Sequence, residues 1–122
     1  MDKVKVLMID DNVQLIEAVK EYFKSSKQIE IIEEAHDGLE GFKKLEKSIC
    51  DVVILDLIMP NKDGLYVLEE LKNKNINIPV IICSSVRLSI PDVVGCIHYN
   101  EWYSDLDGDM KEMIEIIRTM EG

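Results

Sequence analysis

Short apolar runs alternate with amphipathic segments along the chain, and this alternation limits the folds that the chain can adopt. The runs are rich in valine and isoleucine, which is typical of strands that are buried on both faces. The expected strands are VKVLMI at 4–9, IEII at 29–32, VVIL at 52–55, IPVIIC at 78–83 and GCIHY at 95–99.

The segments between these runs carry apolar residues at helical spacing. Helices are expected at 13–24, around 39–45, from Asp63 onward, and around 110–117. The remaining segment, 86–94, is short and contains Pro91, so the fourth helix is expected to be shortened.

Repeated alternation of strand and helix predicts a doubly wound α/β fold, with one five-stranded parallel sheet and helices on both faces. Right-handed crossovers favour the flavodoxin-like strand order 2-1-3-4-5. The sequence contains no linker, repeat or low-complexity stretch, so residues 1–122 are expected to form a single domain.

The composition is that of a soluble globular protein, with 47% hydrophobic residues, 31% charged residues and a net charge of −10. The negative charge argues against direct binding of nucleic acid or of an anionic membrane. No apolar run approaches the roughly 20 residues of a membrane span, and the first ten residues lack the long apolar region expected of a secretory signal. The three cysteines, Cys50, Cys83 and Cys96, have no metal-site spacing and are expected to be buried, reduced thiols of a cytoplasmic protein.

Carboxylates follow two of the predicted strands. Asp10 and Asp11 follow the first strand, and Asp56 follows the third. The expected strand order places these two strands side by side, so the three carboxylates should crowd one crevice at the carboxyl edge of the sheet. Crowded carboxylates raise one another's pKa or bind a cation, and an all-oxygen site favours Mg²⁺. A carboxylate at such a site can accept a phosphoryl group.

Helix capping is the ordinary alternative for acidic residues that follow a strand. One residue of 10–12 is expected to cap the first helix. Asp56 cannot act as a cap, because Pro60 follows it and the next helix begins near Asp63, which is itself a good N-cap. Asp56 is therefore the stronger functional candidate.

Three other polar residues have less support as functional groups. Ser84 ends the fourth strand, and it attracts interest only because Asp56 should be its neighbour. His36 lies in a predicted turn and His98 in a predicted strand, with no second metal ligand nearby in sequence. Both histidines are interpreted as structural.

Three motifs carry a family resemblance: VLMIDDN at 6–12, VVILDLIMPNKDG at 52–64 and VIICSS at 80–85. Together they resemble the receiver domain of two-component response regulators, the CheY-like family, and most of all its sporulation-type members. The resemblance implies that Asp56 is the phosphoacceptor. It also implies that Asp11, Asp56 and the backbone carbonyl of Ile58 bind Mg²⁺ directly, while Asp10 acts through water.

The same resemblance implies roles for two further residues and for partners. Ser84 would be the switch hydroxyl that moves to the phosphoryl group, and Tyr99 would be the aromatic switch. The phosphoryl donor would be a histidine kinase or a phosphotransfer protein, and the output an effector domain or a homodimer. Such a domain takes part in phosphoryl transfer and slow self-dephosphorylation without being an enzyme in its own right.

The C-terminal third departs from the family pattern. The family has a lysine followed by a proline after the fifth strand, and alignment puts Trp102 and Tyr103 at those positions. Arg87 is the nearest other cation and is interpreted as a solvated loop residue. The chemistry of phosphorylation is therefore expected to be retained and the readout to be altered.

Three other functions stay open beside the phosphorylated receiver. A degenerate pseudo-receiver would bind protein partners independently of phosphorylation; the loss of the lysine favours it and the intact acid cluster opposes it. A flavin mononucleotide carrier is weaker, because Asp10 and Asp11 would face the flavin phosphate. A stand-alone phosphatase is also weak, because the sequence shows no independent general base.

Overall fold

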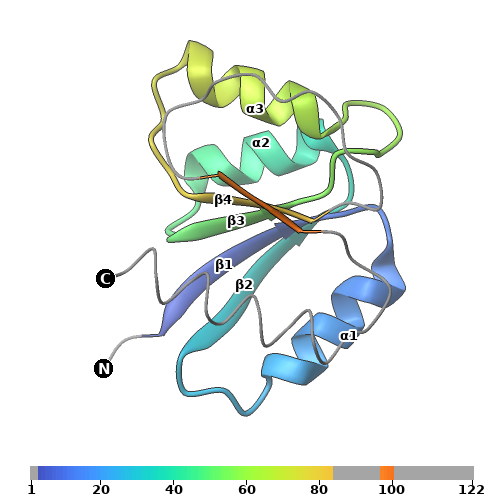
Figure 1. Ribbon diagram of the computed structural model, residues 1–122, viewed down its shortest axis with the longest axis vertical. Helices are drawn as coiled ribbons and strands as arrows, with labels where there is room; N and C mark the ends of the chain where they lie inside the picture. Colours follow the sequence, from blue (N-terminus) through green and yellow to red (C-terminus); the bar gives the residue numbers. More distant parts are fainter. Residues whose placement is uncertain (1–2, 84–96, 101–122) are drawn as a thin grey trace.

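A computed structural model gives the structure of residues 3–83 and 97–100, which are coloured in Figure 1. Several predictions lie outside these described residues. They concern the shortened fourth helix, the final helix, Ser84, Arg87, Cys96, Trp102 and Tyr103.

The described part of the chain contains a five-stranded parallel sheet with the order β2-β1-β3-β4-β5, which confirms the predicted strand order. The strands are β1 (Val4–Ile9), β2 (Ile29–Ala35), β3 (Val52–Leu55), β4 (Val80–Cys83) and β5 (Ile97–Asn100).

The predicted bounds are confirmed for β1 and β3 and differ for the other strands. β2 continues three residues past its predicted end at Ile32, because Glu33 and Glu34 pair with Leu7 and Met8 of β1. β4 begins at Val80 rather than at residue 78. The residue before it, Pro79, has no N–H that could donate a hydrogen bond to the neighbouring strand. Its carbonyl accepts the Val53 N–H.

A bulge interrupts the pairing of β2 with β1. Val6 pairs with Ile31, and the next residue of β1, Leu7, pairs with Glu33. Ile32 therefore has no counterpart in β1, which is the arrangement of a β-bulge on an edge strand.

The helices among the described residues are α1 (Val13–Phe23), α2 (Gly38–Lys47) and α3 (Gly64–Asn73). Each is capped by a side chain that accepts a backbone N–H of the first turn. Asn12 caps α1, Asp37 caps α2 and Asp63 caps α3. The prediction for Asp63 is confirmed, and Asn12 is the residue of 10–12 that serves as a cap.

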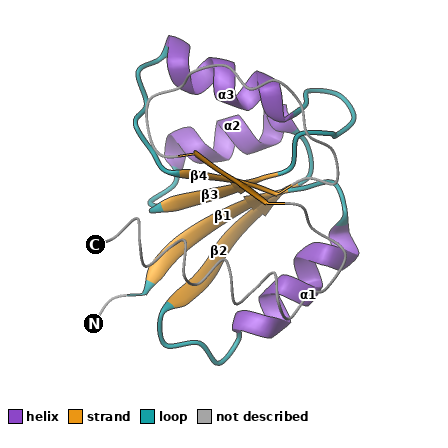
Figure 2. Cartoon of the chain, in the orientation of Figure 1, coloured by secondary structure: helices purple, strands orange, loops and turns teal. Residues whose placement is uncertain are grey.

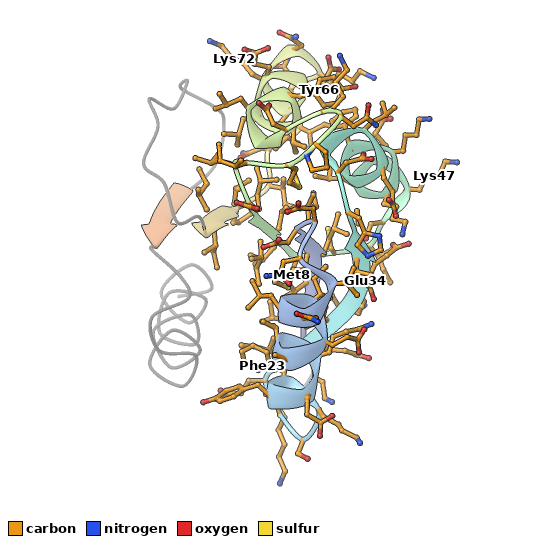
Figure 3. The ribbon with its side chains drawn as sticks, turned by 90° about the vertical axis from the view of Figure 1, so that its right-hand side faces the viewer. Met8, Phe23, Glu34, Lys47, Tyr66 and Lys72 are labelled. Carbon is orange, nitrogen blue, oxygen red and sulfur yellow. The ribbon has the colours of Figure 1, made fainter. Side chains whose placement is uncertain are left out.

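Helices cover both faces of the sheet, as predicted: α1 lies on one face, and α2 and α3 lie together on the other (Figure 1). Alternation along β1 divides the core between these two layers. Met8 packs in the cluster that includes Phe23 of α1; both are labelled in Figure 3. Leu7 and Ile9 point the other way and pack in the cluster beneath α2 and α3.

Candidate functional site

The ends of β1 and β3 lie side by side at the carboxyl edge of the sheet. Ile9 pairs with Leu55 as the last residues of the two strands. Hydrogen bonding continues one residue further, because the Asp56 N–H donates to the Ile9 carbonyl at 2.9 Å. On the other side, the Asp10 N–H donates to the Ala35 carbonyl at 3.0 Å. The backbones of Asp10 and Asp56 are therefore fixed by the sheet itself.

The structure brings Asp10, Asp11 and Asp56 together. One carboxylate oxygen from each lies within 4.8 Å of those of the other two. Asp10 and Asp56 are buried, with exposed fractions of 2% and 7%, while Asp11 is exposed. The group thus has a buried base and a rim open to solvent. Converging carboxylate oxygens of this kind fit a hard divalent cation such as Mg²⁺.

Local hydrogen bonds orient the two buried carboxylates. Asp10 Oδ1 accepts the Asn12 N–H at 2.8 Å, and Asp56 Oδ1 accepts the Ile58 N–H at 3.3 Å. In each case the donor lies two residues further along the chain, which is the pattern of an Asx-turn. The three residues after β1 therefore have different positions: Asp10 is held inward, Asp11 faces solvent, and Asn12 caps α1.

In the loop between β3 and α3, residues 56–63, successive side chains from Leu57 to Met59 point alternately into the core and toward solvent. Leu57 and Met59 are buried, with exposed fractions of 0% and 8%. Ile58 between them is 51% exposed and lies two residues past Asp56. Its side chain therefore faces solvent in the loop that follows Asp56.

The loop is also fastened to the start of α2, a contact that sequence reasoning missed. The Gly38 N–H donates to the Lys62 carbonyl at 2.5 Å, and Asn61 Nδ2 donates to Asp37 Oδ2 at 3.2 Å. The pKa of Asp37 is lowered, first by the backbone N–H of Glu40 and further by the amide of Asn61. The signal in the sequence was the pair Asp37-Gly38, which predicted only a turn.

Two predicted switch residues are placed incompletely. Ser84 lies outside the described residues. Tyr99 lies in β5, where its backbone pairs with Ile82 of β4, and its side chain is not described. The roles expected for both side chains therefore stay predictions.

Two residues interpreted as structural have clear surroundings. His36 Nε2 lies 2.9 Å from Glu34 Oε2 at the sheet edge. Cys50 is a free thiol, and burial is the main cause of its raised pKa. It is half-buried rather than fully buried, because it lies in the connection between α2 and β3. Cys83 ends β4, and its side chain is not described.

The helices within the described ranges are too short and too polar to cross a bilayer.

Comparison with known proteins shows the family. A family model for the response regulator receiver domain matches residues 6–101 of the chain. A protein-glutamate methylesterase/protein-glutamine glutaminase from Treponema denticola is 36% identical over 86 residues. That match covers 70% of this chain and 23% of the relative, so the chain spans about a quarter of the relative's length.

Solved structures show the same fold. The response regulator domain of Thermotoga maritima CheB superposes with a TM-score of 0.79 at 24% identity, covering 98% of this chain and 96% of that one. A DNA-binding response regulator of the LuxR family from Staphylococcus aureus gives a TM-score of 0.76 at 27% identity, covering 98% and 99%. The finer resemblance to sporulation-type receivers stays a prediction.

The family model spans well over half of the chain, and the acidic group lies within the matched residues. The chain therefore belongs to the family of response regulator receiver domains.

Proposed function

We propose that this chain is a phosphoacceptor receiver of two-component signal transduction, phosphorylated on Asp56 in the presence of Mg²⁺. The observation that carries the proposal is the convergence of three carboxylates at the ends of β1 and β3. Two of these carboxylates are buried, and burial of like charges is costly unless a cation or a proton compensates it. Receiver domains typically bind Mg²⁺ at an acidic pocket, and the residues present here fit that ion.

Asp56 is the residue that we assign as nucleophile. Its backbone is fixed by the sheet, and its Oδ1 is oriented by the Ile58 N–H, so the carboxylate is held in place beside Asp10 and Asp11. A carboxylate oxygen of Asp56 would form a bond to phosphorus as the bond between phosphorus and the donor atom breaks. The donor nitrogen of a phosphohistidine, or the donor oxygen of a small acyl phosphate, leaves with that electron pair.

Asp10 and Asp11 would hold the metal together with Asp56 and the carbonyl of Ile58. Bound Mg²⁺ would neutralise charge on the transferring phosphoryl oxygens. Asp11 is exposed and can reach the ion directly, whereas Asp10 is held inward by the Asn12 N–H and suits a contact through water.

The rest of the signalling role is also proposed from the family. Ser84 and Tyr99 would read the phosphorylated state, and the donor would be a histidine kinase or a phosphotransfer protein. The output would be an effector domain or a homodimer, in the cytoplasm, with no direct contact with nucleic acid or membrane. We also propose that residues 1–122 form one receiver domain.

Phosphoryl incorporation from acetyl phosphate, with and without Mg²⁺, tests the proposal. The unaltered protein should gain one phosphoryl group when Mg²⁺ is present, as measured by intact-protein mass. Asp56→Asn should keep the fold and gain none, because the amide has no nucleophilic oxygen of comparable strength.

Asp63→Asn is the matched control, because Asp63 lies at the end of the same loop and caps α3. Asparagine caps a helix about as well as aspartate, so this variant should be phosphorylated normally. Label on the Asp56→Asn protein would contradict the assignment. Failure of the unaltered protein to take up the group would favour the pseudo-receiver instead.

A further inference from the structure

The loop that carries Ile58 is fastened to the start of α2 by neighbours in space that lie far apart in sequence. Asn61 and Lys62 of the loop contact Asp37 and Gly38, at the point where the loop passes the start of α2 (Figure 2). The fit is close, because a β-carbon at Gly38 would lie 2.6 Å from the Lys62 carbonyl oxygen. The loop and the helix start therefore cannot move independently.

Asp37 has two functions in this contact, one for each carboxylate oxygen. Oδ1 accepts the Glu40 N–H at 2.8 Å and so caps α2. Oδ2 accepts Nδ2 of Asn61 at 3.2 Å. Capping α2 requires only the bond from the Glu40 N–H. The bond from Asn61 instead connects the loop to the start of α2.

Asn61 adopts a backbone conformation that needs support. Its φ is 67°, in the left-handed region that costs a side-chain-bearing residue free energy. Asparagine tolerates this region better than most residues, and here its amide also gains a carboxylate partner. The bond to Asp37 therefore helps to keep the loop in this conformation.

The segment from Asn61 back to Ile58 is stiff enough to transmit the constraint. Pro60 has a fixed φ, and Met59 is buried in the core cluster beneath α2 and α3. Displacement at Asn61 would therefore move the backbone at Ile58, whose N–H binds Asp56 Oδ1.

We propose that Asp37 is a positioning residue for the metal site: it acts through Asn61 to hold the loop, and with it the backbone of Ile58, beside Asp56. This inference rests on the proposed function, because it concerns the Mg²⁺ that the acidic group would bind. Asp37 itself does not touch the ion. Its effect is to restrict the loop to the conformation in which the oxygens of the site are already gathered.

Mg²⁺ affinity of a small set of variants tests the inference, measured by calorimetry on the full chain at a temperature where every variant is folded. Asn61→Gly removes the amide, changes no charge, and keeps the left-handed φ. Asp37→Ser keeps an N-cap and loses the oxygen that faces Asn61. Each should weaken binding by about threefold to tenfold, the size of effect that one hydrogen bond carries.

A double variant shows whether Asp37 and Asn61 affect Mg²⁺ affinity through the same contact or independently. If both residues act through one contact, Asp37→Ser combined with Asn61→Gly should weaken Mg²⁺ binding little more than either change alone. Asp37→Asn should reduce Mg²⁺ affinity less than Asp37→Ser. An asparagine at position 37 can cap α2 and still hydrogen-bond to Asn61 once the side-chain amide of Asn61 is flipped. Both changes at position 37 remove one charge, so their difference is not an effect of charge.

Asn75→Gly is the matched control, because Asn75 also has a positive φ, of 55°, and lies after the far end of α3. It should leave Mg²⁺ affinity unchanged. Amide hydrogen exchange adds a readout that does not depend on the metal: Gly38 should exchange faster in Asn61→Gly and not in Asn75→Gly.

Two different failures can be told apart. If the unaltered protein binds Mg²⁺ and Asn61→Gly changes neither the affinity nor the exchange of Gly38, the inference is overturned and the proposed function stands. If the unaltered protein binds no Mg²⁺, the proposed function fails and the inference falls with it, a result that is evident before any variant is made.

Discussion

Gly64, the first residue of α3, lies directly against the backbone of Asp56. A β-carbon at Gly64 would overlap the Asp56 carbonyl oxygen and would lie 2.8 Å from the Cα of Leu57. The Gly64 N–H also donates to the Leu57 carbonyl at 3.1 Å. The start of α3 is thus packed onto the peptide that follows Asp56, and only glycine permits this approach.

Gly64→Ala should therefore be strongly destabilising. The atoms that a new methyl group would meet belong to backbone held by the sheet, so they cannot give way. The expected loss in the free energy of unfolding is roughly 2–4 kcal/mol, measured by urea denaturation. Mg²⁺ binding should weaken in parallel, because relief of the overlap displaces Asp56.

Gly41→Ala is the comparison that isolates the backbone effect. A β-carbon there would also be crowded, but by side-chain atoms of Ile9, the nearest at 2.7 Å. The overpacking is partly offset by helix propensity, since alanine exceeds glycine by about 1 kcal/mol inside a helix. The Gly41→Ala protein should be clearly more stable than the Gly64→Ala protein, and equal losses would contradict this explanation.

Mg²⁺ should raise the melting temperature of the unaltered protein, because only the folded state gathers the three carboxylates. At a concentration about a hundredfold above Kd, mass action stabilises the folded state by about 2.7 kcal/mol. Asp11→Asn should weaken binding by roughly tenfold or more. Without metal the same variant should melt slightly higher, because it relieves repulsion among neighbouring carboxylates.

Asp51→Asn serves as the control for this prediction. Asp51 is also exposed, and it lies just before β3, at the opposite end of that strand from Asp56, where its Oδ2 accepts the Lys5 N–H at 2.9 Å. Its replacement should leave the shift caused by Mg²⁺ intact. A melting temperature unmoved by millimolar Mg²⁺ in the unaltered protein would count against the site.

Ile58 should slow the hydrolysis of phosphorylated Asp56. Its side chain is 51% exposed two residues past Asp56, and an apolar group can exclude water but cannot orient it for attack. Ile58→Asn should shorten the half-life of the phosphoryl group by roughly tenfold, followed by intact-protein mass after removal of the donor. Ile49→Asn, at an exposed isoleucine (71%) in the connection between α2 and β3, should not change the half-life.

Stability should fall on acidification partly through Asp37 and Glu34. The pKa of Asp37 is lowered mainly by the Glu40 N–H, and that of Glu34 mainly by its hydrogen bond with Lys20. A carboxyl group whose pKa is lower in the folded state contributes stability that is present above its unfolded pKa. That contribution is lost as the pH falls through the lower, folded value, from about pH 4 downward.

Asp37→Asn should accordingly flatten this part of the pH profile. The amide keeps the cap but does not titrate, so the variant should lose less of its free energy of unfolding between neutral and acidic pH. Urea denaturation at a series of pH values measures the difference. A slope unchanged by the substitution would show that Asp37 does not contribute to the acid sensitivity.

The sheet and the acidic group could be predicted because both depend on strong local signals. β3 is a continuous apolar run and β1 is interrupted only by Lys5, and an aspartate follows each strand, so their bounds follow from the sequence alone. β2 was predicted too short because Glu33 and Glu34 have low strand propensity. Their place in the sheet comes from pairing with β1, which no local pattern records.

The fastening of the loop to α2 could not be predicted for a related reason. Asp37 and Asn61 lie 24 positions apart, and each belongs to a short polar stretch that is adequately explained as a turn. Only the packing of α2 beside α3 brings them together. The same packing explains why a glycine is required at position 38, where a β-carbon would meet the backbone of Lys62 and Asp63.

The bulge at Ile32 has a consequence for how copies of the protein meet in solution. β2 lies at the edge of the sheet, where a strand from another chain could extend the ladder and begin aggregation. The bulge breaks the regular spacing that such a strand would need, and Glu30 and Glu33 place like charges on the same strand. Glu34, labelled in Figure 3, is also acidic but pairs with Lys20 at 2.6 Å. At neutral pH the charges of Glu30 and Glu33 oppose edge-to-edge pairing with a second copy of the chain. In acid the charges are lost and the bulge alone protects against fibrous association.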